Sequence, residues 1–313
     1  LFLTDKQGGI CMDKQLISSY FQRALNLVNP NISNIRRTPS GMTNESYFVE
    51  VNGAEYVIRI PGSGTDQLVD RINEKNNLYF GTELGINPEL IYFDTDSGVK
   101  ITKMISSPKT LTKELARENK MMKKIISLLQ RLHQSNTVMK NHFELFQLMI
   151  YYENLVQEVN PFMLEEVWVI KEDILELQKD YEALPVEEVP CHIDTIPENF
   201  IYDTKNETLY LIDWEYSGMF DPMWDIATLC LTLQLTEEEE LFFLKHYLER
   251  DPMEEEMQRI LLHKILQDYL WALRTIYKEE KCLDYGSLAR ERMNRAKKTS
   301  PLIRRHIIYD NVG

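Results

Sequence analysis

The chain has 313 residues, 43% of them hydrophobic, which is enough to fill the core of one bilobal unit or of two domains. A net charge of −14 argues against a nucleic-acid partner held through phosphate contacts and suits a small cationic substrate. The longest apolar run, near 226–235, is too short to span a bilayer. Four widely spaced cysteines lack pairing or metal-ligand spacing, which predicts a reducing, cytoplasmic compartment.

The N-terminal part predicts a small lobe built on an antiparallel sheet. Residues 1–12 carry no secretory signal and are expected to be a linker, an expression remnant or the tail of an upstream segment. A helix over 13–28 and a helix over 68–83 have apolar residues at helical spacing. The expected strands are 32–38, 45–51, 55–60, 90–93 and 99–104, with Asn52-Gly53 as a hairpin turn. A crossover at 105–108 ends this lobe.

Beyond the crossover the pattern becomes mainly helical. One long helix with an apolar face is expected over 111–132, and helices are expected over 143–158 and 162–181. A hairpin with strands 200–203 and 208–212 follows, and then four helices over 224–233, 237–248, 254–277 and 285–298. The predicted domains are therefore 1–104 and 105–313, in an α+β fold.

The segment from His192 to Asn199 carries the chemistry. Asp194 follows His192 by two residues, Asn199 comes five residues later, and Asp213 lies beyond one hairpin. Protein kinases use the same order: an Asp serves the substrate hydroxyl, and an Asn and a second Asp hold Mg²⁺. We therefore predict Asp194, Asn199 and Asp213 as catalytic residues, the last two as metal ligands, and His192 as a support of the loop.

Residues of the first part are predicted to bind the nucleotide. Ser40, Gly41, Thr43 and Asn44 form a small-residue loop whose backbone N–H groups can approach phosphates. Arg59 stands where a kinase strand carries its phosphate-binding cation, and an arginine keeps its charge when it is desolvated.

Two acidic residues have supporting roles in this prediction. Glu74, on the helix that follows, is the expected partner of Arg59, although both could be ordinary surface residues. Asp225 is expected to cap or brace the catalytic loop from a helix N-terminus.

These residues resemble the choline/ethanolamine kinases and, more widely, the aminoglycoside phosphotransferase group of small-molecule kinases. The similarity runs from about Ser40 to Ala296 and looks closest to bacterial choline kinases that serve phosphocholine decoration of cell surfaces. The resemblance implies a bilobal protein-kinase-like fold. It assigns ATP and Mg²⁺ as cofactors, residues 1–104 as the nucleotide-binding lobe and 105–313 as the catalytic and acceptor-binding lobe.

The implied acceptor is choline, whose quaternary ammonium must be held by aromatic faces and carboxylates because it has no N–H to donate. Trp271 is the foremost predicted contact, and Tyr216, Tyr285 and Glu215 are further candidates. Glu215 could reach the cationic substrate or a second metal, and it is equally well explained as a solvent carboxylate. Trp214 is expected to be a core residue.

Two positions depart from the pattern of the bacterial choline kinases. Arg274 stands where a second tryptophan is usual, and Thr232 stands where a glutamate is usual. These changes leave open ethanolamine, another amino alcohol or a small anionic or sugar alcohol as acceptor. Phosphorylation of an antibiotic is a further alternative, and a non-catalytic nucleotide-binding module is a third, disfavoured by the presence of Asp194, Asn199 and Asp213.

Overall fold

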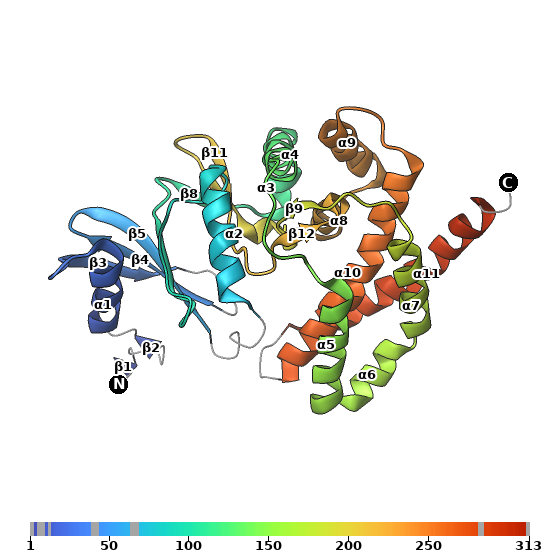
Figure 1. The fold of residues 1–313 in the computed structure, drawn as a ribbon, viewed down its shortest axis with the longest axis horizontal. Helices are drawn as coiled ribbons and strands as arrows, with labels where there is room; N and C mark the ends of the chain where they lie inside the picture. Colours follow the sequence, from blue (N-terminus) through green and yellow to red (C-terminus); the bar gives the residue numbers. More distant parts are fainter. Residues whose placement is uncertain are drawn as a thin grey trace. The chain divides into compact units, whose positions relative to one another are not determined.

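The computed structural model describes residues 3–4, 10–11, 14–38, 44–62, 69–280 and 285–310 (Figure 1). The chain divides into two compact units. The first unit comprises Leu1–Lys109 and Ile201–Glu215, and the second comprises Thr110–Phe200 and Tyr216–Gly313. The hairpin that follows the predicted catalytic loop (residues 192–199) therefore packs with the N-terminal part of the chain.

A five-stranded antiparallel sheet of order β3-β4-β5-β7-β6 forms the first unit. Its elements are β3 (Ile32–Arg37), β4 (Asn44–Val51), β5 (Ala54–Pro61), β6 (Leu90–Phe93) and β7 (Lys100–Lys103), with helix α2 (Arg71–Glu83) inserted before β6. Asn52 and Gly53, both at positive φ, make the tight turn between β4 and β5 that the sequence predicted.

Helix α1 (Lys14–Leu25) covers the sheet with its apolar face. Ile17, Tyr20 and Phe21 pack with Val49 and Ile58 in the core of this unit. Two small sheets are also present. Strands β1 (Leu3–Thr4) and β2 (Ile10–Cys11) form one of them. The other has the order β11-β10-β8 and consists of β8 (Pro108–Thr110), β10 (Phe200–Asp203) and β11 (Thr208–Leu211). The turn between β10 and β11 is fixed by Asp203, which accepts from the backbone of Lys205 and Asn206.

The second unit is mainly helical. Its helices are α3 (Lys113–Arg117), α4 (Asn119–His133), α5 (Leu145–Val159), α6 (Pro161–Trp168), α7 (Lys171–Glu182), α8 (Pro222–Leu233), α9 (Glu237–Leu248), α10 (Glu254–Glu280) and α11 (Leu288–Asp310). Strands β9 (Val189–Cys191) and β12 (Gly218–Phe220) pair antiparallel, and the short 3₁₀ turn η1 (Pro197–Asn199) closes the catalytic loop.

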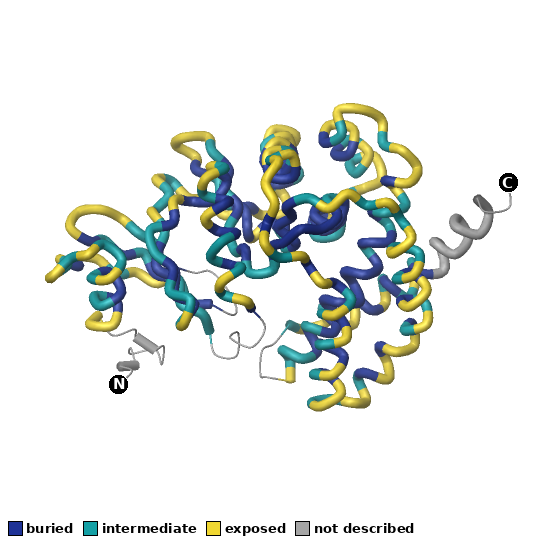
Figure 2. The backbone as a smooth tube through the Cα atoms, viewed as in Figure 1, coloured by how far each residue is buried: buried dark blue, intermediate teal, exposed yellow. Residues whose placement is uncertain are grey.

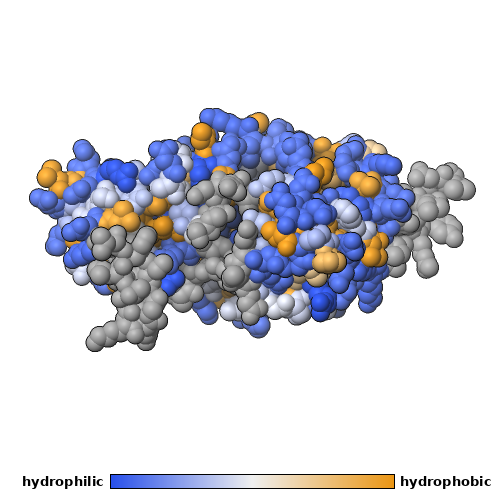
Figure 3. All heavy atoms as spheres, turned by 90° about the horizontal axis from the view of Figure 1, so that it is seen from below, coloured by the Kyte–Doolittle hydropathy of each residue, from blue (hydrophilic) through white to orange (hydrophobic). Residues whose placement is uncertain are grey.

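Helix α10 is the core of the second unit, because α5, α6, α7, α8 and α11 all pack against it. Its middle, from Leu262 to Leu273, is almost continuously buried (Figure 2). Some apolar side chains remain exposed, including Phe162 and Val169. On the face drawn in Figure 3, hydrophobic residues form small separate groups among hydrophilic ones. None of the described helices is long and apolar enough to cross a membrane.

The predicted α+β class, with an antiparallel sheet in the N-terminal part and helices in the C-terminal part, is confirmed. Two helices that the sequence predicted as continuous are each divided into two in the structure. The helix expected over 111–132 is interrupted at Glu118, whose backbone is extended, and Thr112 caps the short α3 that precedes it. The helix expected over 162–181 is divided into α6 and α7 at 169–170, where the sequence has neither proline nor glycine.

Candidate active site

Arg59, on β5, lies at the centre of a charged cluster in the first unit. Its guanidinium donates to Asp213 Oδ2 at 2.6 Å, and the two side chains are only 16% and 18% exposed. Asn44, with its amide oxygen turned toward Arg59, accepts from Arg59 Nε at 3.1 Å. Burial alone would lower the pKa of Arg59, but the charge of Asp213 raises it above its usual value. The guanidinium is therefore a fixed positive charge.

Glu74 has partners other than the one predicted. Lys100 Nζ lies 2.8 Å from Glu74 Oε1, and Arg71 donates to Glu74 Oε2 at 2.7 Å. Although burial would raise it, Lys100 and Arg71 hold the pKa of Glu74 below its usual value. The expected Arg59–Glu74 pair was thus wrong: the arginine pairs with Asp213, and the glutamate pairs with Lys100 and Arg71.

A narrow pocket lies among these residues. It is lined by residues of β4, β5, α2, the turn before β7, β7 itself and the segment after β11: Asn44, Arg59, Pro61, Arg71, Glu74, Gly98, Lys100 and Glu215. Gly98, at φ +70°, lets Arg71 pass, because a Cβ there would lie 2.7 Å from Arg71 Nε. Ser40, Gly41 and Thr43 lie outside the described residues.

Glu215 belongs to the same cluster. Burial, and next the charge of Asp213, raise the pKa of Glu215 to about 7, while Arg59 and Lys100 act in the opposite direction. Asp213 has a left-handed backbone at φ +72°, which a non-glycine residue rarely adopts. Trp214 between them is fully buried and donates to the Leu211 carbonyl, so its predicted core role is confirmed.

The catalytic loop of the second unit places Asp194 beside Asn199. The Asn199 amide nitrogen donates to the backbone oxygen of Asp194 at 2.8 Å and to its Oδ2 at 3.0 Å. This orients the carboxylate of Asp194, and it commits the Asn199 nitrogen, so that Oδ1 is the atom left to serve as a ligand.

Asp225, on α8, holds this loop from behind. Its two carboxylate oxygens accept from the backbone of His192 at 2.8 Å and of Ile193 at 2.7 Å, and its own carbonyl accepts from Thr195. Ile193 is fully buried at φ +73°, a strained conformation for a β-branched residue that persists only where the surroundings impose it. The predicted bracing role of Asp225 is confirmed, while Asp221 is the residue that caps α8.

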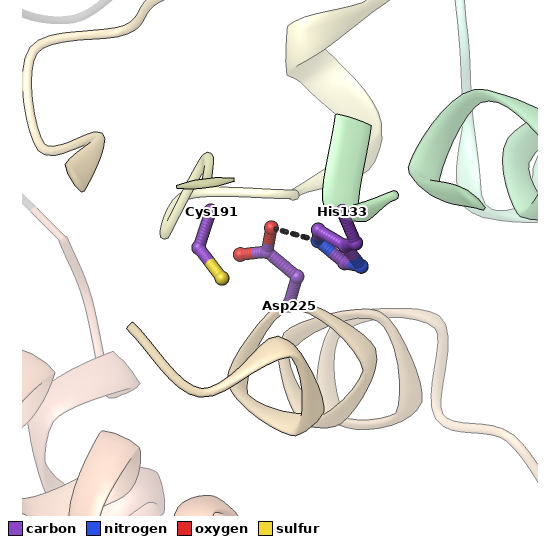
Figure 4. A group of neighbouring side chains, drawn as sticks. All are labelled: His133, Cys191 and Asp225. Carbon is purple, nitrogen blue, oxygen red and sulfur yellow. Dashed lines mark hydrogen bonds and ion pairs between the residues drawn. The ribbon is translucent and has the colours of Figure 1, made fainter. Parts of the chain in front are cut away.

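His133, Cys191 and Asp225 form a buried group behind the loop (Figure 4). His133 uses both ring nitrogens, one with Asp225 at 3.0 Å and the other with the Tyr247 hydroxyl at 2.7 Å. Burial raises the pKa of the Cys191 thiol well above its usual value, which keeps the thiol protonated in these surroundings. These side chains are accounted for as a support of the loop.

Two of the predicted acceptor residues, Tyr216 and Trp271, meet: Trp271 lies on α10 and Tyr216 on the segment that leads into β12. The rings of Tyr216 and Trp271 are edge to face with centroids 5.4 Å apart. The Arg274 guanidinium lies 5.8 Å from the Tyr216 centroid and 5.7 Å from the Trp271 centroid, and its Nε donates to the Tyr216 hydroxyl at 3.1 Å. An aromatic pair suited to a cation is therefore already in contact with a cation of the chain.

Tyr285 and Thr232 complete the picture of this region. Burial raises the pKa of Tyr285, whereas the positive charge of Arg274 lowers it. The Tyr285 hydroxyl and the Arg274 guanidinium are therefore close enough to interact electrostatically. Thr232 donates to the Thr228 carbonyl at 2.7 Å, within its own helix, and brings no charge.

Sequence reasoning missed three residues of these clusters. Lys100 gave a weak signal, since it lies on a strand that also carries the exposed Lys103. His133 gave none, because a histidine near the end of a helix is ordinary. Arg292, on α11, has a buried Nε without a hydrogen-bond partner, and burial together with Arg274 and Arg295 lowers its pKa.

Comparison with known proteins shows the family of the chain. The sequence profile of the choline/ethanolamine kinases matches residues 35–233. The LicA protein of Haemophilus influenzae is 31% identical over 263 residues, which cover 82% of this chain and 97% of that protein.

Solved structures give the same result. LicA in complex with AMP superposes with a TM-score of 0.80 at 34% identity, over 94% of this chain and all of that one. Choline kinase LicA from Streptococcus pneumoniae gives 0.79 at 34% identity, over 92% and 98% of the two chains. Aminoglycoside 2′-phosphotransferase IIIa, at 13% identity and a TM-score of 0.62, shares the fold.

The family match and the LicA relatives show an ATP-dependent phosphotransferase that acts on an alcohol group, and the fold is kinase-like. The chain belongs to the choline/ethanolamine kinase family.

Proposed function

We propose that the protein transfers the γ-phosphoryl group of Mg²⁺-bound ATP to the hydroxyl of choline, yielding phosphocholine. The observation that carries this proposal is the catalytic loop, in which the Asp194 carboxylate is oriented by Asn199 while Asp225 fixes the backbone behind it. Choline as the acceptor is supported by the 34% identity to choline kinase LicA from Streptococcus pneumoniae.

Asp194 is the group that accepts the proton of the acceptor hydroxyl. Its half-buried carboxylate is held on one side by the Asn199 amide, which leaves acceptor capacity for a substrate hydroxyl. A positioned carboxylate of this kind contributes to transfer both by orienting the nucleophile and by taking its proton.

The residues present fit Mg²⁺, which prefers oxygen ligands. Asp213 offers a carboxylate, and Asn199 offers the amide oxygen left after its nitrogen is committed to Asp194. Burial, and next the charge of Asp213, raise the pKa of Glu215, and a bound cation would favour its charged form. When bound, Mg²⁺ neutralises charge on the ATP phosphates.

The first unit is the nucleotide-binding lobe in this proposal. Arg59 supplies a permanent cation for the phosphates, Asn44 holds it, and Ser40, Gly41 and Thr43 contribute backbone N–H groups. Residues from the crossover onward form the catalytic and acceptor-binding lobe, with the hairpin 201–215 carrying Asp213 into the first unit. A cytoplasmic location stays a prediction; the buried thiols of Cys191 and Cys230 are unpaired, as a reducing compartment would leave them.

A second acceptor is favoured by the position of Arg274. Its guanidinium contacts the ring pair of Tyr216 and Trp271, which a trimethylammonium group would otherwise contact. A smaller ammonium, as in ethanolamine, needs less of this aromatic surface, and carboxylates or hydroxyls can hold its N–H groups. Ethanolamine or another small hydroxyl compound is therefore the alternative substrate.

The test is ADP release from Mg²⁺-ATP with choline, ethanolamine, their N-methylated intermediates and an aminoglycoside. We expect choline-dependent release that falls about 10²- to 10⁴-fold in Asp194→Asn, as for loss of a general base. The matched control is Glu198→Gln, an exposed carboxylate of the same loop, which should retain activity. Acceptor-independent release alone, or full activity of Asp194→Asn, would overturn the proposal.

A further inference from the structure

Lys100 is a buried lysine that the proposed mechanism leaves without a role. It begins β7, pairs in register with Arg59 of β5, and is only 7% exposed. Its Nζ lies 2.8 Å from Glu74 Oε1 and 3.9 Å from Asp213 Oδ1. Two cations on neighbouring strands thus lie side by side, and both are within ion-pair distance of the Asp213 carboxylate.

Stability alone is a weak reason for this arrangement. Burying an amine costs several kcal/mol, and a buried ion pair often does no better than an apolar pair of the same size. A neighbouring position shows the cheaper solution, because Lys103, on the same strand, keeps its side chain 65% exposed and pairs with Glu89 at the surface. A lysine retained inside this pocket suggests that its charge has a use there.

The donors of the ammonium fit a phosphate. Lysine carries three N–H donors, and the contact with Glu74 uses one. Lys100 also lines the pocket that contains Arg59, Asn44 and Glu215. A lysine ammonium beside an arginine guanidinium can bind oxygens of two successive phosphates. Hydrogen bonds between such charged groups are stronger than hydrogen bonds between neutral groups.

We propose that Lys100 is a second phosphate-binding residue, which contacts the phosphates of a nucleoside di- or triphosphate beside Arg59. Glu74 orients Lys100, and Arg71 holds Glu74 from the other side. The role of a kinase lysine that pairs with a helical glutamate is thereby divided between two strands: β5 supplies Arg59 and β7 supplies the partner of Glu74. This inference rests on the proposed use of ATP but not on the identity of the acceptor.

The experiment compares ligands with and without phosphates. Dissociation constants of ADP, ATP and adenosine are measured by titration calorimetry for the wild type, Lys100→Met and Lys103→Met. We expect Lys100→Met to weaken ADP and ATP about 10- to 100-fold, as for a lost hydrogen bond between charged groups, and to leave adenosine unchanged. Lys103→Met, the control on the same strand, should change none of the three.

Two further variants keep the test decisive if Lys100→Met folds poorly. Lys100→Arg retains the charge and should keep ADP within a few-fold of the wild type, whereas Glu74→Gln should weaken ADP but not adenosine. Equal weakening of adenosine and ADP in folded variants, or unchanged ADP affinity, would overturn the role of Lys100. If the wild type does not bind ADP, both the role of Lys100 and the proposed function are wrong. If the wild type binds ADP but turns over no acceptor, only the proposed function is wrong, and the ADP affinity of the Lys100 variants still decides the role of Lys100.

Discussion

At the scale of one residue, Arg274 is the side chain that bears most directly on which acceptor the proposed site binds. Its guanidinium lies less than 6 Å from both the Tyr216 and the Trp271 centroids and is hydrogen-bonded to the Tyr216 hydroxyl. A choline ammonium that uses the same rings must displace this guanidinium. In the proposed acceptor site, Arg274 would act against choline twice: it would repel the ammonium, and it stands where an aromatic side chain is expected.

We therefore expect Arg274→Trp to lower the KM for choline. One cation–π contact contributes about 0.5–2 kcal/mol, so the change should be roughly two- to thirtyfold. Steady-state kinetics with choline and with ethanolamine measure it. Arg274→Gln separates the two effects, since it removes the charge without adding a ring. A KM that stays constant or rises in both variants would mean that residue 274 does not face the bound acceptor.

At the scale of elements, the catalytic loop depends on the first turn of α8. Asp225 accepts from two successive backbone N–H groups of the loop and from His133, so a single carboxylate fixes a backbone that includes the strained Ile193. An asparagine cannot reproduce this, because its NH₂ group would face an N–H donor.

Asp225→Asn should therefore lower kcat about 10- to 100-fold, the loss typical of a misplaced catalytic group. It should also cost about 1–3 kcal/mol of unfolding free energy for the unsatisfied N–H group. Turnover and urea unfolding are measured together, with the exposed Asp251→Asn as control. Destabilisation with an unchanged kcat would show that the contact supports the fold but not the loop geometry.

Asp221, the cap of α8, predicts a pH dependence of stability. It bonds to Arg259 and to His263 at 2.8 Å. Although burial would raise it, these partners hold the pKa of Asp221 well below its usual value. A lowered pKa in the folded state gives stability that is present above the unfolded pKa of about 4 and is lost as the pH falls further.

In Asp221→Asn, the free energy of unfolding should fall by about 3–5 kcal/mol at pH 7, because the partly buried Arg259 loses its counter-charge and His263 loses a carboxylate partner. The difference from the wild type should shrink below about pH 4, where the carboxylate begins to be protonated. Urea unfolding from pH 7 to pH 3 measures both, with the exposed Glu89→Gln as control. A difference that is constant with pH would exclude the charge of Asp221 as its cause.

The sequence predicted these elements well where the signal is local. The Asn52-Gly53 turn and the β10–β11 hairpin follow from turn residues, and bracing by Asp225 follows from its place in the first turn of a helix. It failed where tertiary packing decides. Residues 111–132 have one continuous apolar face, yet the chain bends at Glu118, and Arg59 finds its partner 154 residues away in Asp213.

At the scale of the whole molecule, the first unit is discontinuous in sequence. Residues 201–215 belong to it although 91 residues of the second unit precede them. The segment supplies Trp214, which fits so closely over α2 that a Cβ on Gly81 would lie 2.6 Å from its ring. It also supplies Asp213, the counter-charge of the buried Arg59. The backbone N–H of Leu211, in the same segment, donates a hydrogen bond to the Ile86 carbonyl.

Residues 14–109 alone should therefore not fold stably. Losing the burial of Trp214 costs about 1.5–3 kcal/mol, and leaving Arg59 uncompensated costs about 3–5 kcal/mol. Together these approach the whole stability of a typical domain, about 5–15 kcal/mol. Joining residues 201–215 to 14–109 through a flexible Gly/Ser linker should restore a cooperative urea transition, because every partner just named is then present. The same fusion with Trp214→Ala and Asp213→Ala is the matched control and should behave like 14–109. If 14–109 unfolded with the same midpoint as the fusion, the hairpin would be an appendage of a unit that is already complete.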